Sequence, residues 1–240
     1  MSIADRVWSP YCGAGPVPAE LWARWNFEPV GLATLVALAV LLLKSSENRL
    51  LALAAMAVLV MIFVSPLCAL SSALFAARTV HHVLLVAAAA PLIAWALPHP
   101  ARAPRLAAWT SAFVIAFWFW HAPAAYGSAM ANDGVYALMQ LSLLITATAA
   151  WRAVRISRPT GAVCALLATT VLMGLLGAIL TFAPRALYAP HDLTTAAWGL
   201  TPLEDQQIAG LIMWIPAAGI YLASALSILA GVLRPRLAAA

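Results

Sequence analysis

The sequence predicts an all-α, polytopic membrane protein: a transmembrane bundle of about seven helices. Of its 240 residues, 65% are hydrophobic and only 9% are charged, and the mean hydropathy is +0.94. A soluble domain carries roughly 25% charged residues, so the expected solvent for this chain is lipid. Continuous apolar runs favour helices, because backbone groups in lipid must pair within their own segment.

Seven apolar runs come close to the roughly 20 residues that a span requires. They cover 28–44, 49–65, 79–98, 105–123, 134–153, 160–182 and 206–233. The second run continues past Ser65-Pro66 into 67–76, either as a kinked helix or as a short interfacial one. The seventh follows Thr201-Pro202-Leu203-Glu204, which offers a cap, a proline at the first helical position and an acid at the third.

Residues 1–27 are expected to form an outer, polar and aromatic N-terminal segment rather than a signal peptide. No linker or repeat divides the chain, so residues 1–240 are expected to form a single membrane domain.

The charges predict the orientation. One set of helix ends holds nine basic residues and one acid, whereas the other set holds four basic residues and seven acids. The basic set consists of Lys44, Arg49, Arg102, Arg105, Arg152, Arg155, Arg158, Arg234 and Arg236. By the positive-inside rule this set faces the cytoplasm, with the N-terminus out and the C-terminus in. The net charge of +5 is therefore an orientation signal, and we expect a multi-pass protein of the plasma (inner) membrane with no nucleic-acid partner.

Four of the five histidines fall on the outer side: His81, His82, His121 and His191, whereas His99 is cytoplasmic. The third and fourth spans could bring His82 and His121 together, and neutral imidazole binds copper, zinc and haem iron. Consecutive residues point about 100° apart on a helix, so His81 and His82 do not easily share one inward site. The alternative is that each is an interfacial histidine bonded to water or backbone.

Cys12 and Cys68 are both predicted on the outer side. They could form a disulfide in an oxidising compartment, act as soft copper ligands, or be two unrelated thiols. Arg78 precedes His82 by one turn, and we interpret it as an interfacial arginine whose charge reaches the lipid headgroups.

Other polar residues are interpreted as structural. Asp133 is expected to cap the fifth span. At the head of the seventh span, Glu204 has a capping role, while Gln206 and Gln207 suggest inward hydrogen bonding. The chain has no phosphate loop, GxGxxG, Ser-His-Asp pattern or HExxH, so a non-enzymatic role is expected.

Motifs spread from residue 11 to about residue 214 carry a family resemblance. They are YCG at 11–13 with RWN at 24–26, SPLCALS at 65–71, HHVLL at 81–85 with APL at 90–92, WHAP at 120–123 with Tyr126, and TPLEDQQIAG at 201–210 with Met213-Trp214. Together they resemble the CtaG family of membrane-embedded cytochrome c oxidase assembly factors, which is associated with caa-type oxidases. The run at 201–210 is the most specific.

The resemblance implies a chaperone of the respiratory chain that binds cytochrome c oxidase subunits within the lipid bilayer. Its role would be maturation of a haem-copper oxidase, assisting copper-centre formation at the outer side of the membrane. The candidate copper ligands are His82, His121, Cys12, Cys68 and His81, with His82 preferred over His81.

The chain departs from the family pattern at Arg78, Tyr136 and Gln140, where the family often has histidines. The resemblance therefore implies only part of a metal site. The alternative function is a b-type haem or quinone-linked electron carrier, with His82 and His121 as axial ligands.

Overall fold

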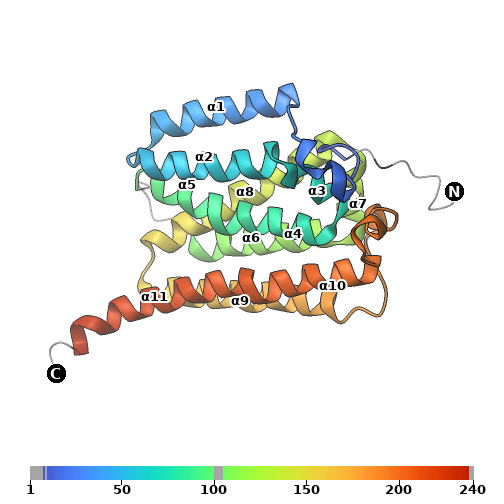
Figure 1. Cartoon of the computed structure of the whole chain (residues 1–240). Coiled ribbons are helices and arrows are strands. Elements are labelled where there is room, and N and C mark those ends of the chain that lie inside the picture. Colours follow the sequence, from blue (N-terminus) through green and yellow to red (C-terminus); the bar gives the residue numbers. More distant parts are fainter. Residues whose placement is uncertain (1–7, 9, 100–104, 238–240) are drawn as a thin grey trace.

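The computed structural model describes residue 8, residues 10–99 and residues 105–237, with side chains up to residue 233. Every regular element in these ranges is helical, which confirms the all-α prediction (Figure 1). Five members of the charge pattern, Asp5, Arg6, Arg102 and the side chains of Arg234 and Arg236, lie outside the described residues.

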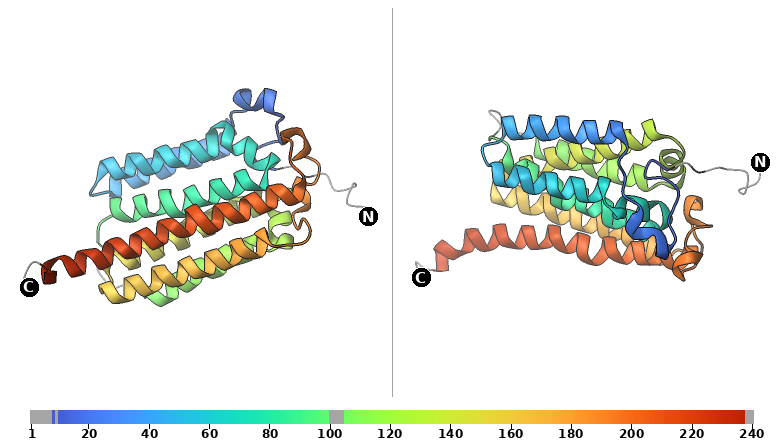
Figure 2. Two further views of the ribbon diagram at one scale, coloured as in Figure 1. Left: turned by 60° about the horizontal axis from the view of Figure 1, so that its bottom comes forward. Right: turned by 45° about the horizontal axis from the view of Figure 1, so that its top comes forward.

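The helices lie side by side along one common direction (Figures 1 and 2). The α-helices are α1 (Pro29–Ser45), α2 (Arg49–Val64), α3 (Pro66–Ala73), α4 (Phe75–Leu84), α5 (Ala90–Ala96), α6 (Leu106–His121), α7 (Pro123–Ala131), α8 (Asp133–Ile156), α9 (Pro159–Thr181), α10 (Pro202–Ile212) and α11 (Ala218–Leu237). Short 3₁₀ or π segments are η2 (Pro18–Ala23), η3 (Leu85–Ala89), η4 (Ala189–His191), η5 (Ala196–Trp198) and η6 (Met213–Ala217).

Two long helices each contain a π segment. η3 joins α4 to α5 and makes one helix, Phe75–Ala96, and η6 joins α10 to α11 around Pro216. Proline removes a backbone donor, so a local widening of the helix at Pro216 has a clear cause.

Within the described part of the chain, four helices are long and apolar enough to cross a membrane: Phe75–Ala96, Asp133–Ile156, Pro159–Thr181 and Pro202–Leu233. A fifth span results if α2 and α3 count together, although they are bent by 49°. Pro66 begins α3 at this bend, as expected for a proline at the first position of a new helix. The helices α1 and α6 are apolar but shorter, with 17 and 16 residues, so length and composition support a membrane bundle of four or five spans.

The helix Phe75–Ala96 lies at the centre of the bundle. Of its best apolar window, 67% is buried, against 22% for the helix Pro202–Leu233, and it packs against α2, α8 and α10. It begins at Phe75 rather than at the predicted residue 79. The central helix therefore carries Arg78, His81 and His82 inside the protein.

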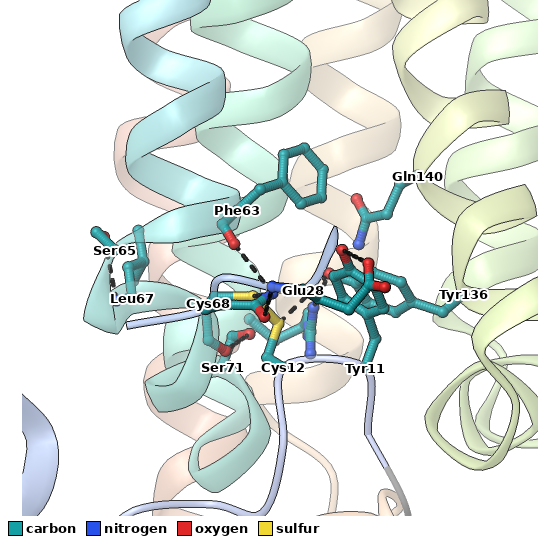
Figure 3. Close-up of a disulfide and its surroundings, with 12 residues drawn as sticks. Tyr11, Cys12, Glu28, Phe63, Ser65, Leu67, Cys68, Ser71, Tyr136 and Gln140 are labelled. Atoms are coloured by element: carbon teal, nitrogen blue, oxygen red, sulfur yellow. Dashed lines mark hydrogen bonds between the residues drawn. A yellow bond between two sulfur atoms is a disulfide. The ribbon is translucent and has the colours of Figure 1, made fainter. Parts of the chain in front are cut away.

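The bundle has two distinct ends. We call one the histidine end; it holds the N-terminal segment, α3, α7 and the loop with η4 and η5, on the right of Figure 1. The opposite end, which holds Lys44, Arg152 and Arg155, is the arginine end. A Cys12–Cys68 disulfide fastens the N-terminal segment to α3 (Figure 3), and the Trp198 indole donates a hydrogen bond of 3.0 Å to the Pro16 carbonyl. The histidine end is thus closed over by segments distant in the sequence.

Candidate functional site

A carboxylate from another helix caps the first turn of the central helix. The backbone N–H groups of Phe75 and Ala76 donate to Asp205 over 2.6 and 3.0 Å. The first N–H groups of a helix have no intrahelical acceptor, and a negative charge there also interacts favourably with the helix dipole. The buried Asp205 therefore fixes where α4 begins, and with it the position of the histidines one to two turns later.

The neighbouring residues of α10 behave as their sequence suggests. Thr201 and Glu204 form a reciprocal capping box, with Pro202 at the start of the helix. The buried Gln206 accepts from the Leu187 N–H over 2.7 Å and donates to the Leu180 carbonyl over 3.2 Å. The capping and the inward hydrogen bonding of Gln206 are confirmed, whereas the role of Asp205 was missed. An acid entering an apolar span was the only signal for it.

The rings of His82 and His121 lie together inside the bundle. Their centroids are 5.6 Å apart and their planes are nearly perpendicular, and the side chains are only 1% and 4% exposed. The Nδ1 of His121 is 2.7 Å from the Phe117 carbonyl. A carbonyl can only accept, so Nδ1 carries the proton and Nε2 is left as the ligating nitrogen.

The two ring nitrogens of His82 differ in their hydrogen bonding within the described structure. Its Nε2 lies 3.5 Å from the amide nitrogen of Gln140, and its Nδ1 has no hydrogen-bond partner among the described residues. Each ring of the pair therefore offers a nitrogen with a lone pair, and Gln140 adjoins the pair.

The other two histidines of this end have separate surroundings. His81 packs against the edge of Phe63 with ring centroids 5.0 Å apart, and its ring centroid is 5.9 Å from that of His82. Neither nitrogen of His81 has a partner in the described part of the chain. His191 shares a hydrogen bond of 2.7 Å with the Tyr126 hydroxyl, and burial, together with the charge of Arg78, lowers the pKa of His191 to about 3. His191 is therefore neutral at physiological pH.

Arg78 is not an interfacial arginine, so that interpretation was wrong. Its side chain has no exposed surface. It donates to the Tyr136 hydroxyl over 3.0 Å and approaches the Met130 sulfur at 3.8 Å, while its guanidinium carbon is 5.2 Å from the centre of the Tyr136 ring. Early initiation of α4 explains the difference, because it places Arg78 one turn inside a buried helix. The charge is held by uncharged partners.

Tyr136 links this arginine to the N-terminal segment. The ring of Tyr11 stacks on Tyr136 with centroids 5.0 Å apart, and the Tyr11 hydroxyl donates to Glu28 over 3.1 Å. Burial and the adjacent Glu28 raise the pKa of Tyr11 to about 12. The N-terminal segment therefore contributes an uncharged phenol to the outermost layer of the site.

Of the three alternatives for Cys12 and Cys68, the structure has the disulfide (Figure 3). Both residues are buried, and the Asn26 amide lies 3.5 Å from the Cys68 sulfur. Metal ligation by cysteine requires a thiolate, so copper ligation by this pair would first require reduction. Cys164 is a free, exposed cysteine.

The expected cap of the fifth span is also corrected. Asn132 caps α8 by accepting from the Val135 N–H over 3.1 Å, while Asp133 is the first helical residue. An asparagine before an acid is the better cap here, because Asp133 can then add its charge to the first turn.

The described residues contain no group of three or more histidine, cysteine or acidic side chains placed to hold a metal ion. The arrangement is a buried pair of imidazoles, with a third imidazole behind one of them. This pair suits a metal ion that is bound by few ligands better than a structural metal ion, which needs a complete set of protein ligands.

Comparison with known proteins supports the resemblance. A family model described as cytochrome c oxidase caa3 assembly factor matches residues 43–235, which includes the paired histidines but not Cys12. No curated protein and no solved structure matches the chain.

Proposed function

Since the chain belongs to the family of cytochrome c oxidase caa3 assembly factors, we propose that it assists copper-centre formation during oxidase maturation. In this role copper is a cargo, received and passed on at a site formed by His82 and His121. The protein itself is non-catalytic, and its partners are nascent subunits of the oxidase within the bilayer.

The observation that carries this proposal is the contact of two buried imidazoles. The rings of His82 and His121 are 5.6 Å apart, and the hydrogen bond from His121 to Phe117 fixes the tautomer that leaves Nε2 free. Such an orienting hydrogen bond is characteristic of metal-binding histidines. Imidazole is a suitable ligand for copper, and burial excludes competing water.

Two features favour transient over permanent binding. No third conventional ligand completes the pair in the described structure, and Arg78 lies one helical turn from His82, where residues at i and i+4 share a face. A buried cation near the site weakens the binding of another cation. Both features suit a factor that must release its metal.

We place the site on the outer side of the plasma membrane, with seven spans, the N-terminus out and the C-terminus in. The helices α1 and α6 would complete the seven, despite their shorter length. The disulfide at the histidine end supports this placement, because disulfides persist in oxidising compartments outside the cytoplasm. Lys44, Arg152 and Arg155 at the opposite end suit the cytoplasmic side.

Copper binding by purified protein tests the site. The full chain in detergent is titrated with Cu(I) against a chromophoric chelator, alongside His82→Ala, His121→Ala and the control His99→Ala. His99 is exposed and lies near Arg155 at the arginine end. We expect each variant of the pair to bind Cu(I) about tenfold or more weakly, with His99→Ala unchanged. Equal binding by the wild type and the double variant, both shown to be helical, would refute the copper site.

Oxidase maturation tests the assembly role separately. A deletion strain is complemented with the wild type or with His82→Ala, and both the activity and the copper content of the isolated oxidase are measured. We expect the deletion to lower both. Intact activity in the deletion strain would refute the assembly role itself, whereas intact activity with His82→Ala alone would refute only the copper step.

The haem alternative predicts a coloured protein. A haem bound by both imidazoles would need space for its macrocycle beside side chains that are only 1% and 4% exposed. The packing therefore favours copper. A Soret band in purified protein would reverse this preference.

A further inference from the structure

A second site lies beside the histidine pair, in a groove between α1 and α8 with α2 as its floor. Its cavity volume is about 420 Å³, within the range of small-molecule sites, which span about 300–1,000 Å³. The lining residues on α1 and α8 recur every three or four positions, so each helix presents one face to the groove. They include Gly31, Thr34, Leu35 and Leu38 on α1, and Ala137, Gln140, Leu141 and Leu144 on α8.

The groove is polar at one end and apolar along its length. Glu28, Asp133 and Tyr11 lie at the histidine end, whereas leucines of both helices line the remainder. The Glu28 carboxylate accepts from the Val30 and Gly31 N–H groups over 3.0 and 2.6 Å, an arrangement that favours the ionised form. The mouth of the groove therefore carries negative charge.

Gln140 supplies an acceptor that no described residue uses. Its side chain is 5% exposed and lines the groove, and its amide nitrogen faces His82. Its Oε1 is buried without a hydrogen-bond partner. A buried, unpartnered carbonyl oxygen is costly, and a bound donor would relieve that cost. Gln140 is also seven residues from Asp133, about 10 Å deeper along a helix.

Size decides between the possible occupants. A single turn of helix, about 5.4 Å long and 10 Å wide, already displaces roughly the volume of this groove, so a transmembrane segment of a partner does not fit. One acyl or isoprenoid chain does fit. We propose that the groove binds a membrane amphiphile with one apolar chain between α1 and α8 and a non-anionic, hydrogen-donating head that reaches Gln140.

The groove adjoins the proposed copper site through its α2 floor and its α8 wall. Phe63, Gln140 and Tyr136 line the groove, and they contact His81, His82 and Arg78 respectively. Figure 3 shows Phe63, Gln140 and Tyr136 together with Tyr11 and Glu28. An amphiphile in the groove would thus pack directly behind the residues that position the histidine pair. The site goes beyond the proposed function and does not depend on copper binding.

Photolabelling tests the groove in the full chain. The protein is reconstituted into nanodiscs containing a trace lipid with a diazirine on its acyl chain, and adducts are mapped by mass spectrometry. Three headgroups are compared: phosphatidylethanolamine, which donates hydrogen bonds; phosphatidylcholine, which does not; and phosphatidylglycerol, which is anionic. We expect the phosphatidylethanolamine probe to label groove residues about tenfold more than the phosphatidylcholine probe, as for one hydrogen bond to a charged donor. The phosphatidylglycerol probe should label them less than the phosphatidylethanolamine probe.

Matched variants separate the groove from the general lipid shell. Ala137 lines the groove, whereas the equally exposed Ala33 on α1 does not. We expect Ala137→Phe to abolish groove adducts and Ala33→Phe to leave them unchanged. Gln140→Leu should remove the preference for ethanolamine while the chain still labels.

Three outcomes would overturn the proposal. The first is groove labelling no stronger than that of lipid-facing Val36 and Leu138. The second is identical labelling with all three headgroups. The third is a groove free of lipid adducts because α1 closes onto α8 or a protein segment occupies it. Copper titration of the same samples reports on the histidine pair independently, so the two sites can fail separately.

Discussion

The two ends of the bundle differ in the kinds of buried polar side chain that lack a hydrogen-bond partner. Towards the arginine end, donors find backbone carbonyls: the Trp151 indole donates to Val86 over 2.9 Å, and Arg155 donates to Ala94 over 3.0 Å. At the histidine end, the described structure leaves several buried polar atoms without partners. They include Nε of Arg78, both ring nitrogens of His81, Nδ1 of His82 and Oε1 of Gln140, whereas towards the arginine end the unpartnered atoms include the hydroxyls of Thr110 and Thr148.

This difference supports the proposed site at the histidine end. A buried polar group without a partner costs about 1–3 kcal/mol, and such groups are rare enough in folded proteins to require a reason. Towards the arginine end the larger donors Trp151 and Arg155 are hydrogen-bonded, and the unpartnered atoms include two threonine hydroxyls. Several of the unpartnered atoms belong to ionisable or amide side chains around one pair of imidazoles, which is the pattern expected where ligand binding rather than stability selects the residues.

The largest expected effect comes from the disulfide. It closes a loop with a sequence separation of 56 residues, so replacing Cys12 and Cys68 by serine should lower the free energy of unfolding by about 4 kcal/mol. Thermal unfolding in detergent measures this change, and wild type treated with reductant should match the double variant. Cys164→Ser serves as the control, because this exposed thiol is unpaired. A double variant as stable as the wild type would show that the histidine end holds together without its covalent link.

Two adjacent acids give the next contrast. Asp205→Ala leaves two buried N–H groups of α4 without an acceptor and should cost about 3 kcal/mol. Glu204→Ala removes only an exposed capping box and should cost about 1 kcal/mol. Denaturant unfolding of both variants provides the measurement. Equal costs would mean that α4 does not depend on Asp205, and the account of how Arg78 becomes buried would then fail.

An added histidine at position 140, where the family resemblance implies one, tests the copper site directly. Gln140 lies 3.5 Å from His82, so Gln140→His would place a third imidazole beside the pair and should tighten Cu(I) binding about tenfold. Gln207→His on α10 is the matched control and should leave the affinity unchanged. Unaltered affinity in Gln140→His would indicate that the metal does not bind next to His82.

The sequence was sufficient for the fold class and for the approximate helices, because apolar runs of near-span length have few structural alternatives. It was less accurate at helix boundaries. The central helix starts four residues earlier than predicted, because its cap is Asp205, which follows Phe75 by 130 residues. Local propensity carries no information about such a distant acceptor, and the same four residues changed Arg78 from a surface residue to a buried one.

The site was partly predictable for a similar reason. In the predicted topology His82 lies near the start of one span and His121 near the end of the next, at the same end of the bundle, so their proximity could be expected. Their surroundings did not, because the contacts of Gln140 and Tyr136 depend on the rotation of α8. The Cys12 and Cys68 alternatives stayed open in the sequence, since no spacing rule identifies a disulfide across 56 residues.

The smallest expected effect lies at the arginine end. Trp151→Phe removes the indole donor to Val86 but keeps a ring to stack on Tyr221, whose centroid is 5.1 Å from that of Trp151. The Tyr221 hydroxyl lies 3.4 Å from the same carbonyl, so Val86 still has a donor, and the cost should be about 1 kcal/mol. Thermal unfolding measures this loss, and Cu(I) titration of the same variant should match the wild type.

Thermal unfolding and Cu(I) titration of the same variants together test whether the two ends have separate roles. If the ends are specialised as proposed, stability and copper affinity respond separately: Trp151→Phe changes only stability, and His82→Ala changes mainly affinity. His82 has only one weak hydrogen-bonding contact, 3.5 Å from Gln140, so removing its buried ring costs packing contacts and leaves a cavity, while it removes a proposed copper ligand outright. A Trp151→Phe protein that lost copper as severely as His82→Ala would show that the two ends act as one unit, and the unpartnered atoms would then no longer mark a separate functional half.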